Sequence, residues 1–194
     1  IDFTFEEGRI YGLLVYTNVS INKSGYTEVV PGQEIRYTFK DIGNNSTVPL
    51  DSFYWRDTLP TDAVRLDKII TGTYSARLNY KVVFQTNLSN TQRVLADNLN
   101  TLQNYTLDTS PAALGLASNE YVTQVTFLFG RVPGGFRQVE TPYIYCDVLS
   151  SLPHEYRFSN KCDVGGMWQN QWIQATDRWV TIIYRGGPVP TLPR

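Results

Sequence analysis

The strongest constraint in this chain of 194 residues is the spacing of its large side chains, which recur at every second position over most of its length. Alternate residues of a β-strand point to opposite faces of a sheet, whereas an amphipathic helix needs a spacing of about 3.6 residues. Stretches with the helical spacing are nearly absent. The pattern therefore predicts an all-β protein.

Alternating segments that are expected to form strands are separated by short groups of turn residues. The expected strands are residues 10–21, 34–39, 50–58, 64–73, 79–86, 121–129, 143–149, 156–160, 171–175 and 179–184. Turn residues stand at 22–25, 31–32, 43–45, 133–135 and 165–166. Short strands joined by such turns favour an antiparallel β-sandwich, Ig-like or jelly-roll-like in arrangement.

One segment departs from the strand pattern. Residues 110–119 begin with Ser110 and Pro111, a helix cap and a first-turn proline, and good helix formers follow. We therefore expect one short helix across an end of the sandwich. The expected organisation is a strand region at 1–19 that joins the sandwich, a single sandwich domain at 20–185, and a proline- and glycine-rich linker at 186–194.

Charge and hydropathy exclude several classes of function. The chain has 17 basic and 18 acidic residues, so it offers no electrostatic footprint for nucleic acid or for an anionic membrane. No stretch of about 18 apolar residues is present, and the first residues do not resemble a signal peptide. We expect a mature secreted piece with no nucleic-acid partner and no membrane span.

A search for catalytic and metal-binding patterns predicts no enzyme, no cofactor and no metal site. His154 is the only histidine, and its neighbours indicate a solvent-facing turn rather than a catalytic base. Glycosidases can work with two acids alone, for which Glu6 with Glu7, Asp62 with Asp67, and Glu140 with Asp147 are the available sets. Surface charge is the favoured interpretation of these acids. A calcium loop at 41–51 is disfavoured because its spacing matches no EF-hand.

Two further groups of residues have both a structural and a functional interpretation. Trp168 and Trp172, near Trp179 and Tyr184, form either part of the core or an exposed platform on which a sugar could stack. Cys146 and Cys162 are the only thiols, and they form either a disulfide in an oxidising compartment or two buried free thiols.

Three motifs follow one another in the first third of the chain: VPGQEIRYTF at 30–39, DIGNNSTVPLD at 41–51 and DTLP at 57–60. Together they resemble the repeat and stalk domains of sortase-anchored surface proteins of Gram-positive bacteria. Residues 110–125, 130–136 and 158–166 are similar to longer members of the same group. The resemblance covers residues 20–185.

This resemblance implies a non-enzymatic structural or adhesive domain, extracellular and anchored to the cell wall. Its partners would be a host glycan or a matrix protein, with sortase acting at the C-terminus, where Leu192, Pro193 and Arg194 resemble the start of a sortase signal. The alternatives are a carbohydrate-binding module that uses Trp168 and Trp172, and a glycosidase-like enzyme.

Two covalent bonds are candidates, one suggested by a departure from the family pattern and one by the resemblance itself. Cys162 stands where the family has an alanine-like residue, which suggests a disulfide with Cys146. Stalk domains of this kind can carry a lysine–asparagine isopeptide bond whose formation is catalysed by a buried acid. Lys23 and Asn160 are the candidates for that bond, with Glu34 or Asp57 as the acid.

Overall fold

The computed structural model describes residues 3–6, 9–12 and 14–186. Nearly all of its regular structure is β. The strands are β1 (Phe3–Glu6), β2 (Arg9–Gly12), β3 (Val19–Ser24), β4 (Glu28–Val29), β5 (Glu34–Asn44), β6 (Leu50–Thr58), β7 (Val64–Ile70), β8 (Asn79–Thr86), β9 (Ser89–Asn100), β10 (Thr106–Asp108), β11 (Val122–Val132), β12 (Tyr143–Val148), β13 (Arg157–Trp168) and β14 (Gln171–Ile183). The helix α1 spans Pro111–Leu114.

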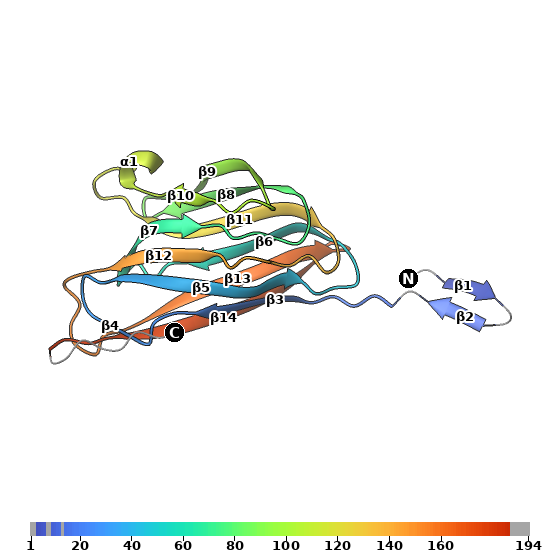
Figure 1. The fold of residues 1–194 in the computed structure, drawn as a ribbon, viewed down its shortest axis with the longest axis horizontal. Helices are drawn as coiled ribbons and strands as arrows, with labels where there is room; N and C mark the ends of the chain where they lie inside the picture. Colours follow the sequence, from blue (N-terminus) through green and yellow to red (C-terminus); the bar gives the residue numbers. More distant parts are fainter. Residues whose placement is uncertain (1–2, 7–8, 13, 187–194) are drawn as a thin grey trace.

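Two sheets pack face to face into an elongated sandwich (Figure 1). The five-stranded sheet has the order β10-β7-β12-β5-β3, and the seven-stranded sheet has the order β4-β14-β13-β6-β11-β8-β9. All pairings are antiparallel except that of β14 with the short β4. β1 and β2 form a separate two-stranded sheet. The predicted fold class, an antiparallel β-sandwich with one short helix, is confirmed.

The space between the sheets is filled by aromatic side chains. Trp55 is fully buried and stacks on Phe127 with 4.1 Å between ring centroids, while Phe39 from the opposite sheet approaches it at 4.8 Å. The Trp55 indole N–H donates to the Tyr74 hydroxyl at 3.0 Å, which in turn donates to the Thr71 carbonyl. The largest buried ring in the core therefore also has its polar atom satisfied.

Replacing this ring should have a large effect on stability. We expect Trp55→Ala to lower the free energy of unfolding by about 3–5 kcal/mol, because it leaves a cavity and frees the Tyr74 hydroxyl. Trp172→Ala, which removes a side chain that is half exposed, should change it by less than about 0.5 kcal/mol. Urea titration followed by circular dichroism measures both. Equal losses for the two variants would contradict this assignment of the core.

The structure corrects several of the predicted boundaries. The segments 171–175 and 179–184 form one strand, β14, and the predicted strand at 10–21 is divided into β2 and β3. The expected turn at 165–166 lies inside β13, and the real turn is at Gln169 and Asn170, both of which have positive φ. The expected turn at 22–25 is largely β3. β9 was not predicted, because it is a polar edge strand with irregular pairing to β8.

The short helix follows its sequence signals. The Ser110 side chain accepts from the Ala113 amide, Pro111 opens the first turn, and Gly115 closes the helix in the left-handed conformation. It is shorter than the predicted segment 110–119.

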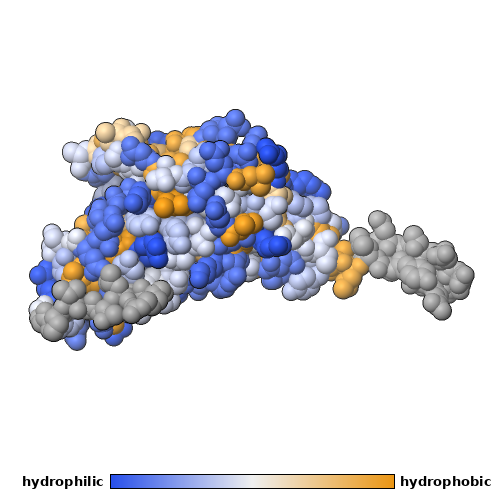
Figure 2. Space-filling model, in the orientation of Figure 1, coloured by the Kyte–Doolittle hydropathy of each residue, from blue (hydrophilic) through white to orange (hydrophobic). Residues whose placement is uncertain are grey.

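Within the described residues, no helix has the length and apolar character needed to cross a membrane. The broad face seen in Figure 2 is mostly hydrophilic, with apolar residues in small separate spots.

Candidate functional site

Three polar residues occupy inward-facing positions on strands whose other inward positions are apolar. Lys23 follows Val19 and Ile21 on β3, with exposed or half-buried residues between them. Asp57 follows Phe53 and Trp55 on β6. Because alternate residues of a strand share a face, both side chains enter the core.

Asn160 reaches the same place from β13, where it lies between the inward-facing Phe158 and Cys162. Cys162 is the direct partner of Asp57 across the β13–β6 pair, so Asn160 lies next to Asp57 on the inner face. Lys23 comes from the five-stranded sheet, whereas Asp57 and Asn160 come from the seven-stranded sheet. The three residues therefore meet between the two sheets.

Asp57 holds the other two side chains through its two carboxylate oxygens. The Lys23 amine donates to Oδ1 at 3.0 Å, and the Asn160 Nδ2 donates to Oδ2 at 3.4 Å. The side chains of Lys23 and Asp57 are completely buried, and Asn160 is fully buried as well. Lys23 and Asn160 are thus brought together by one shared acid.

Burial moves the ionisation of this pair toward the uncharged forms. Desolvation lowers the pKa of Lys23, although the charge of Asp57 opposes the change. Desolvation likewise raises the pKa of Asp57 against the opposing effect of Lys23. Both directions favour a neutral amine, which is nucleophilic, beside a protonated acid, which can donate a proton.

Two aromatic rings enclose the lysine amine. Its Nζ lies 4.2 Å from the centroid of Tyr37 and 4.1 Å from that of Phe39, both on β5. The Tyr37 hydroxyl lies near Asn160 without a hydrogen bond of good geometry, and among the described residues the Asn160 Oδ1 has no hydrogen-bond partner. An unpartnered buried oxygen is costly, so Oδ1 is available to any donor that approaches it.

Only one of the two candidate acids lies at this site. Asp57 contacts both candidate residues, whereas Glu34 is exposed and belongs to a different group of carboxylates. The sequence contained a signal that would have identified the three residues together. In each of the strands β3, β6 and β13, a lysine, aspartate or asparagine stands in the inward register among Val, Ile, Phe and Trp.

The two cysteines lie on opposite sheets near this site. Cys146 is on β12 and Cys162 on β13, and both are buried free thiols in the structure. Burial raises the pKa of Cys162 to about 12 and raises that of Cys146 strongly as well. Thiols held in the protonated form react slowly with other sulfur groups. The disulfide between Cys146 and Cys162 stays a prediction, with the two thiols separate in the structure.

Three carboxylates lie close together, and they include none of the acid pairs considered for a glycosidase. Glu34, Asp67 and Asp147, from three neighbouring strands, have carboxylate oxygens within 4.8 Å of one another. A side-chain hydrogen bond between Glu34 and Asp67, with protonated Glu34 as the donor, raises the pKa of Glu34, and burial raises the pKa of Asp147. His154 lies in a turn, where its Nδ1 accepts from the Arg185 amide, as the sequence predicted for a solvent-facing loop.

The tryptophans near the C-terminus do not form one platform. Trp168 is partly buried against the core, and the Trp179 indole donates to the Tyr26 carbonyl. Trp172 is half exposed and meets Tyr54 edge to face, with 6.0 Å between the ring centroids. The two tryptophans therefore differ in exposure, because Trp172 is half exposed and Trp168 is partly buried.

The predicted sortase-signal residues Leu192, Pro193 and Arg194 lie outside the described residues.

Comparison with known proteins gives no family for the chain. No family model matches it, and no curated protein matches its sequence. One similar solved structure is the collagen-binding subdomain of Enterococcus faecalis surface protein ACE, which is 11% identical to this chain. The match covers 85% of this chain and 96% of that chain, with a TM-score of 0.35. The collagen-binding domain from a Staphylococcus aureus adhesin has 10% identity, 90% and 99% coverage, and a TM-score of 0.34.

An enzyme is found at the same level of similarity. AvmM, which catalyses macrocyclization in alchivemycin A biosynthesis, has 9% identity, 96% and 97% coverage, and a TM-score of 0.34. At TM-scores this low, the likenesses carry no argument about what this chain does. The functional conclusion has to come from the buried residues themselves.

Proposed function

We propose that this chain is a structural or adhesive domain of an extracellular surface protein, and that it stabilises itself by an isopeptide bond between Lys23 and Asn160. The observation that supports this most directly is the fully buried contact of Asp57 with both residues, at 3.0 Å and 3.4 Å. Display on a bacterial cell wall is part of the same proposal and rests on the sequence resemblance.

The proposed reaction needs no cofactor and no oxidant. Rotation of the Asn160 amide by half a turn exchanges its Nδ2 and Oδ1, so that protonated Asp57 donates to Oδ1 and polarises the carbonyl. The lone pair of the neutral Lys23 amine attacks the Asn160 Cγ, and a C–N bond forms. A proton passes from Nζ through Asp57 to Nδ2, the Cγ–Nδ2 bond breaks, and ammonia leaves.

The surroundings suit this reaction. The rings of Tyr37 and Phe39 cover the amine, so water cannot easily hydrate it or compete with it as the nucleophile. The strands of two sheets hold the nucleophile, acid and electrophile in place before the reaction. Because the protein modifies itself once and does not turn over, the proposal is consistent with a non-enzymatic domain.

Replacing the acid tests the proposal. We expect the native protein to be lighter than its sequence mass by one ammonia, and its tryptic digest to contain one peptide pair joined through Lys23 and Asn160. Asp57→Asn keeps both reacting residues but removes the proton donor, so its mass should equal the sequence mass. Intact-mass and tandem mass spectrometry measure both results.

A matched control is Asp163→Asn, on the outer face of the neighbouring strand β13, which should retain the ammonia loss. Full sequence mass for the folded native protein would contradict the cross-link. An unchanged loss of ammonia in Asp57→Asn would contradict the role of the acid.

A further inference from the structure

The outer face of the seven-stranded sheet has a row of side chains that crosses four strands. Cross-strand pairing places Gln174 of β14 opposite Gly165 of β13, Gly165 opposite Tyr54 of β6, and Tyr54 opposite Leu128 of β11. Directly paired residues point to the same side of a sheet. Because Phe127 and Phe129 fill the core, this row faces away from it.

Gly165 is needed for the arrangement of this row. A Cβ at Gly165 would lie 2.9 Å from Cε1 of Tyr54 and 3.0 Å from Cγ of Gln174, so the tyrosine ring occupies the space of the missing side chain. The Tyr54 hydroxyl donates to Asp163 at 2.7 Å and accepts from the Gln174 amide at 2.9 Å. Polar groups on three strands are thereby held in one fixed arrangement.

Arg56 extends the network on the side away from Trp172. Its Nε and Nη2 donate to the two carboxylate oxygens of Asp163 at 2.9 Å and 2.6 Å. A hollow of about 290 Å³ opens beside this ion pair, lined also by Thr58, Gln174 and Thr176. Lys161 also lines the hollow, so the rigid hydrogen-bonding groups of Arg56 and Asp163 lie beside one further positive charge.

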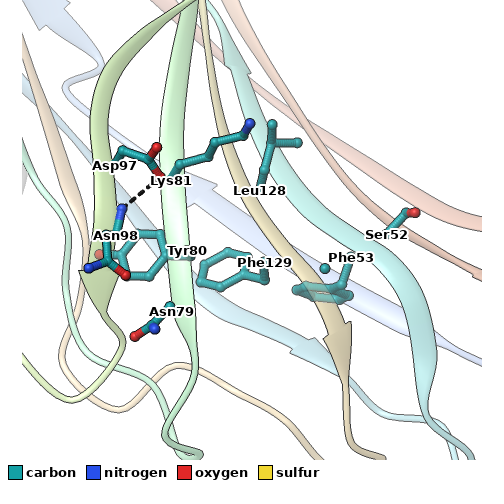
Figure 3. A pocket seen from close by; sticks show the side chains of 10 residues that line it. Ser52, Phe53, Asn79, Tyr80, Lys81, Asp97, Asn98, Leu128 and Phe129 are labelled. Carbon is teal, nitrogen blue, oxygen red and sulfur yellow. Dashed lines mark hydrogen bonds between the residues drawn. The ribbon is translucent and has the colours of Figure 1, made fainter.

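A second hollow lies farther along the same face. It has a volume of about 420 Å³ and is bordered by Leu128 and Lys81, which are paired across β11 and β8, and by Ser52 and Asn98 (Figure 3). Ser52, Asn98 and Gly130 all have positive φ, so adjacent strands are irregular at this place. The row therefore runs from Gln174, at the polar hollow, past Tyr54, which contacts the exposed Trp172, to Leu128 at the larger and more apolar hollow.

We propose that this face binds a neutral oligosaccharide, with one sugar ring stacked on Trp172 and its hydroxyl groups hydrogen-bonded to Asp163 and Gln174. A pyranose presents an apolar C–H face and a polar rim, which fit an exposed aromatic ring beside fixed donors and acceptors. The Asp163 carboxylate accepts hydrogen bonds, which the hydroxyl groups of a neutral sugar can donate and a sulfate or carboxylate group cannot. β13 and β6 each pair with a neighbouring strand on both sides, so neither has a free edge to which a peptide strand could be added.

This inference deepens the adhesive role proposed above and is tested on the full chain. The probes are immobilised cellohexaose and chitohexaose as neutral oligosaccharides, chondroitin sulfate as an anionic one, and a triple-helical peptide of Gly-Pro-Pro repeats. We expect binding of a neutral probe, weakened at least tenfold by Trp172→Ala. The matched control is Val180→Ala, since Val180 has similar exposure on the same strand and face and should leave binding unchanged.

A second variant tests the fixed network. Tyr54→Phe removes the hydroxyl that joins Asp163 to Gln174, and we expect it to weaken binding by about fivefold. The inference is overturned if neither neutral probe binds at millimolar concentration, if Trp172→Ala binds as the native protein does, or if only the sulfated chain or the peptide binds. Intact mass on the same samples reports the cross-link separately, so a failure to bind sugar is distinguishable from a failure of the isopeptide proposal.

Discussion

Pulled from its two ends, the native domain should release a contour length of only about 80 Å, whereas a variant without the cross-link should release more than about 500 Å. The reason is the position of the proposed bond. Lys23 lies on β3, the first strand of the sandwich in the sequence, and Asn160 lies on β13. An applied force therefore passes through the bond and does not reach the strands that lie between these two residues in the sequence. Within the sandwich, only the residues of β3 before Lys23, the rest of β13, and β14 can then be extended.

The matched variant is the double substitution Lys23→Met and Asp57→Asn. Methionine keeps the unbranched stem of lysine, and asparagine keeps the shape of aspartate, so the core stays filled and no buried charge is left alone. Single-molecule force spectroscopy on the domain placed between marker domains measures the released length. A long release from the native protein would show that no bond shields the sandwich.

The second large effect concerns equilibrium stability. A covalent link between Lys23 and Asn160 closes a loop of more than 100 residues in the unfolded chain. The chain-entropy argument used for disulfides gives about 5 kcal/mol for such a loop. We therefore expect the double variant to unfold with a free energy lower by about 5 kcal/mol, since replacing the buried pair by neutral residues of similar size is otherwise close to neutral.

Denaturant titration of the native protein and the double variant measures this difference. Lys23→Met alone serves as a comparison, because it also lacks the bond but leaves Asp57 buried without the amine that donates to it. We expect it to be no more stable than the double variant. Coincident unfolding midpoints for the native protein and the double variant would contradict a stabilising cross-link.

The folded arrangement of individual strands follows largely from local sequence. The end of the strand at Thr58 and the Ser110 cap were both predicted correctly. These features depend on two-residue alternation and on backbone chemistry that acts over a few residues. The polar edge strand β9 and the glycine pair inside β13 were missed, because local patterns do not show which strand lies beside which.

The candidate site depended more strongly on the tertiary structure. Lys23 and Asn160 could be named from the sequence, but two acids stood as alternatives, and Lys23 was expected in a turn. The structure has Lys23 within β3 and Asp57 in contact with both residues, whereas Glu34 lies at the surface. The residues that surround Trp172, Tyr54 above all, were not identified, because they come from β6, far away in the chain.

Alternation alone determined that this chain forms sheets with aromatic residues between them, since the direction of a side chain from a strand is a local property of the backbone. Which inward-facing polar residues meet was decided only by the order and register of the strands. That register brings an amine, an acid and an amide from β3, β6 and β13 into one fully buried space. Burial then shifts the ionisation of the amine and the acid toward the neutral forms that bond formation requires.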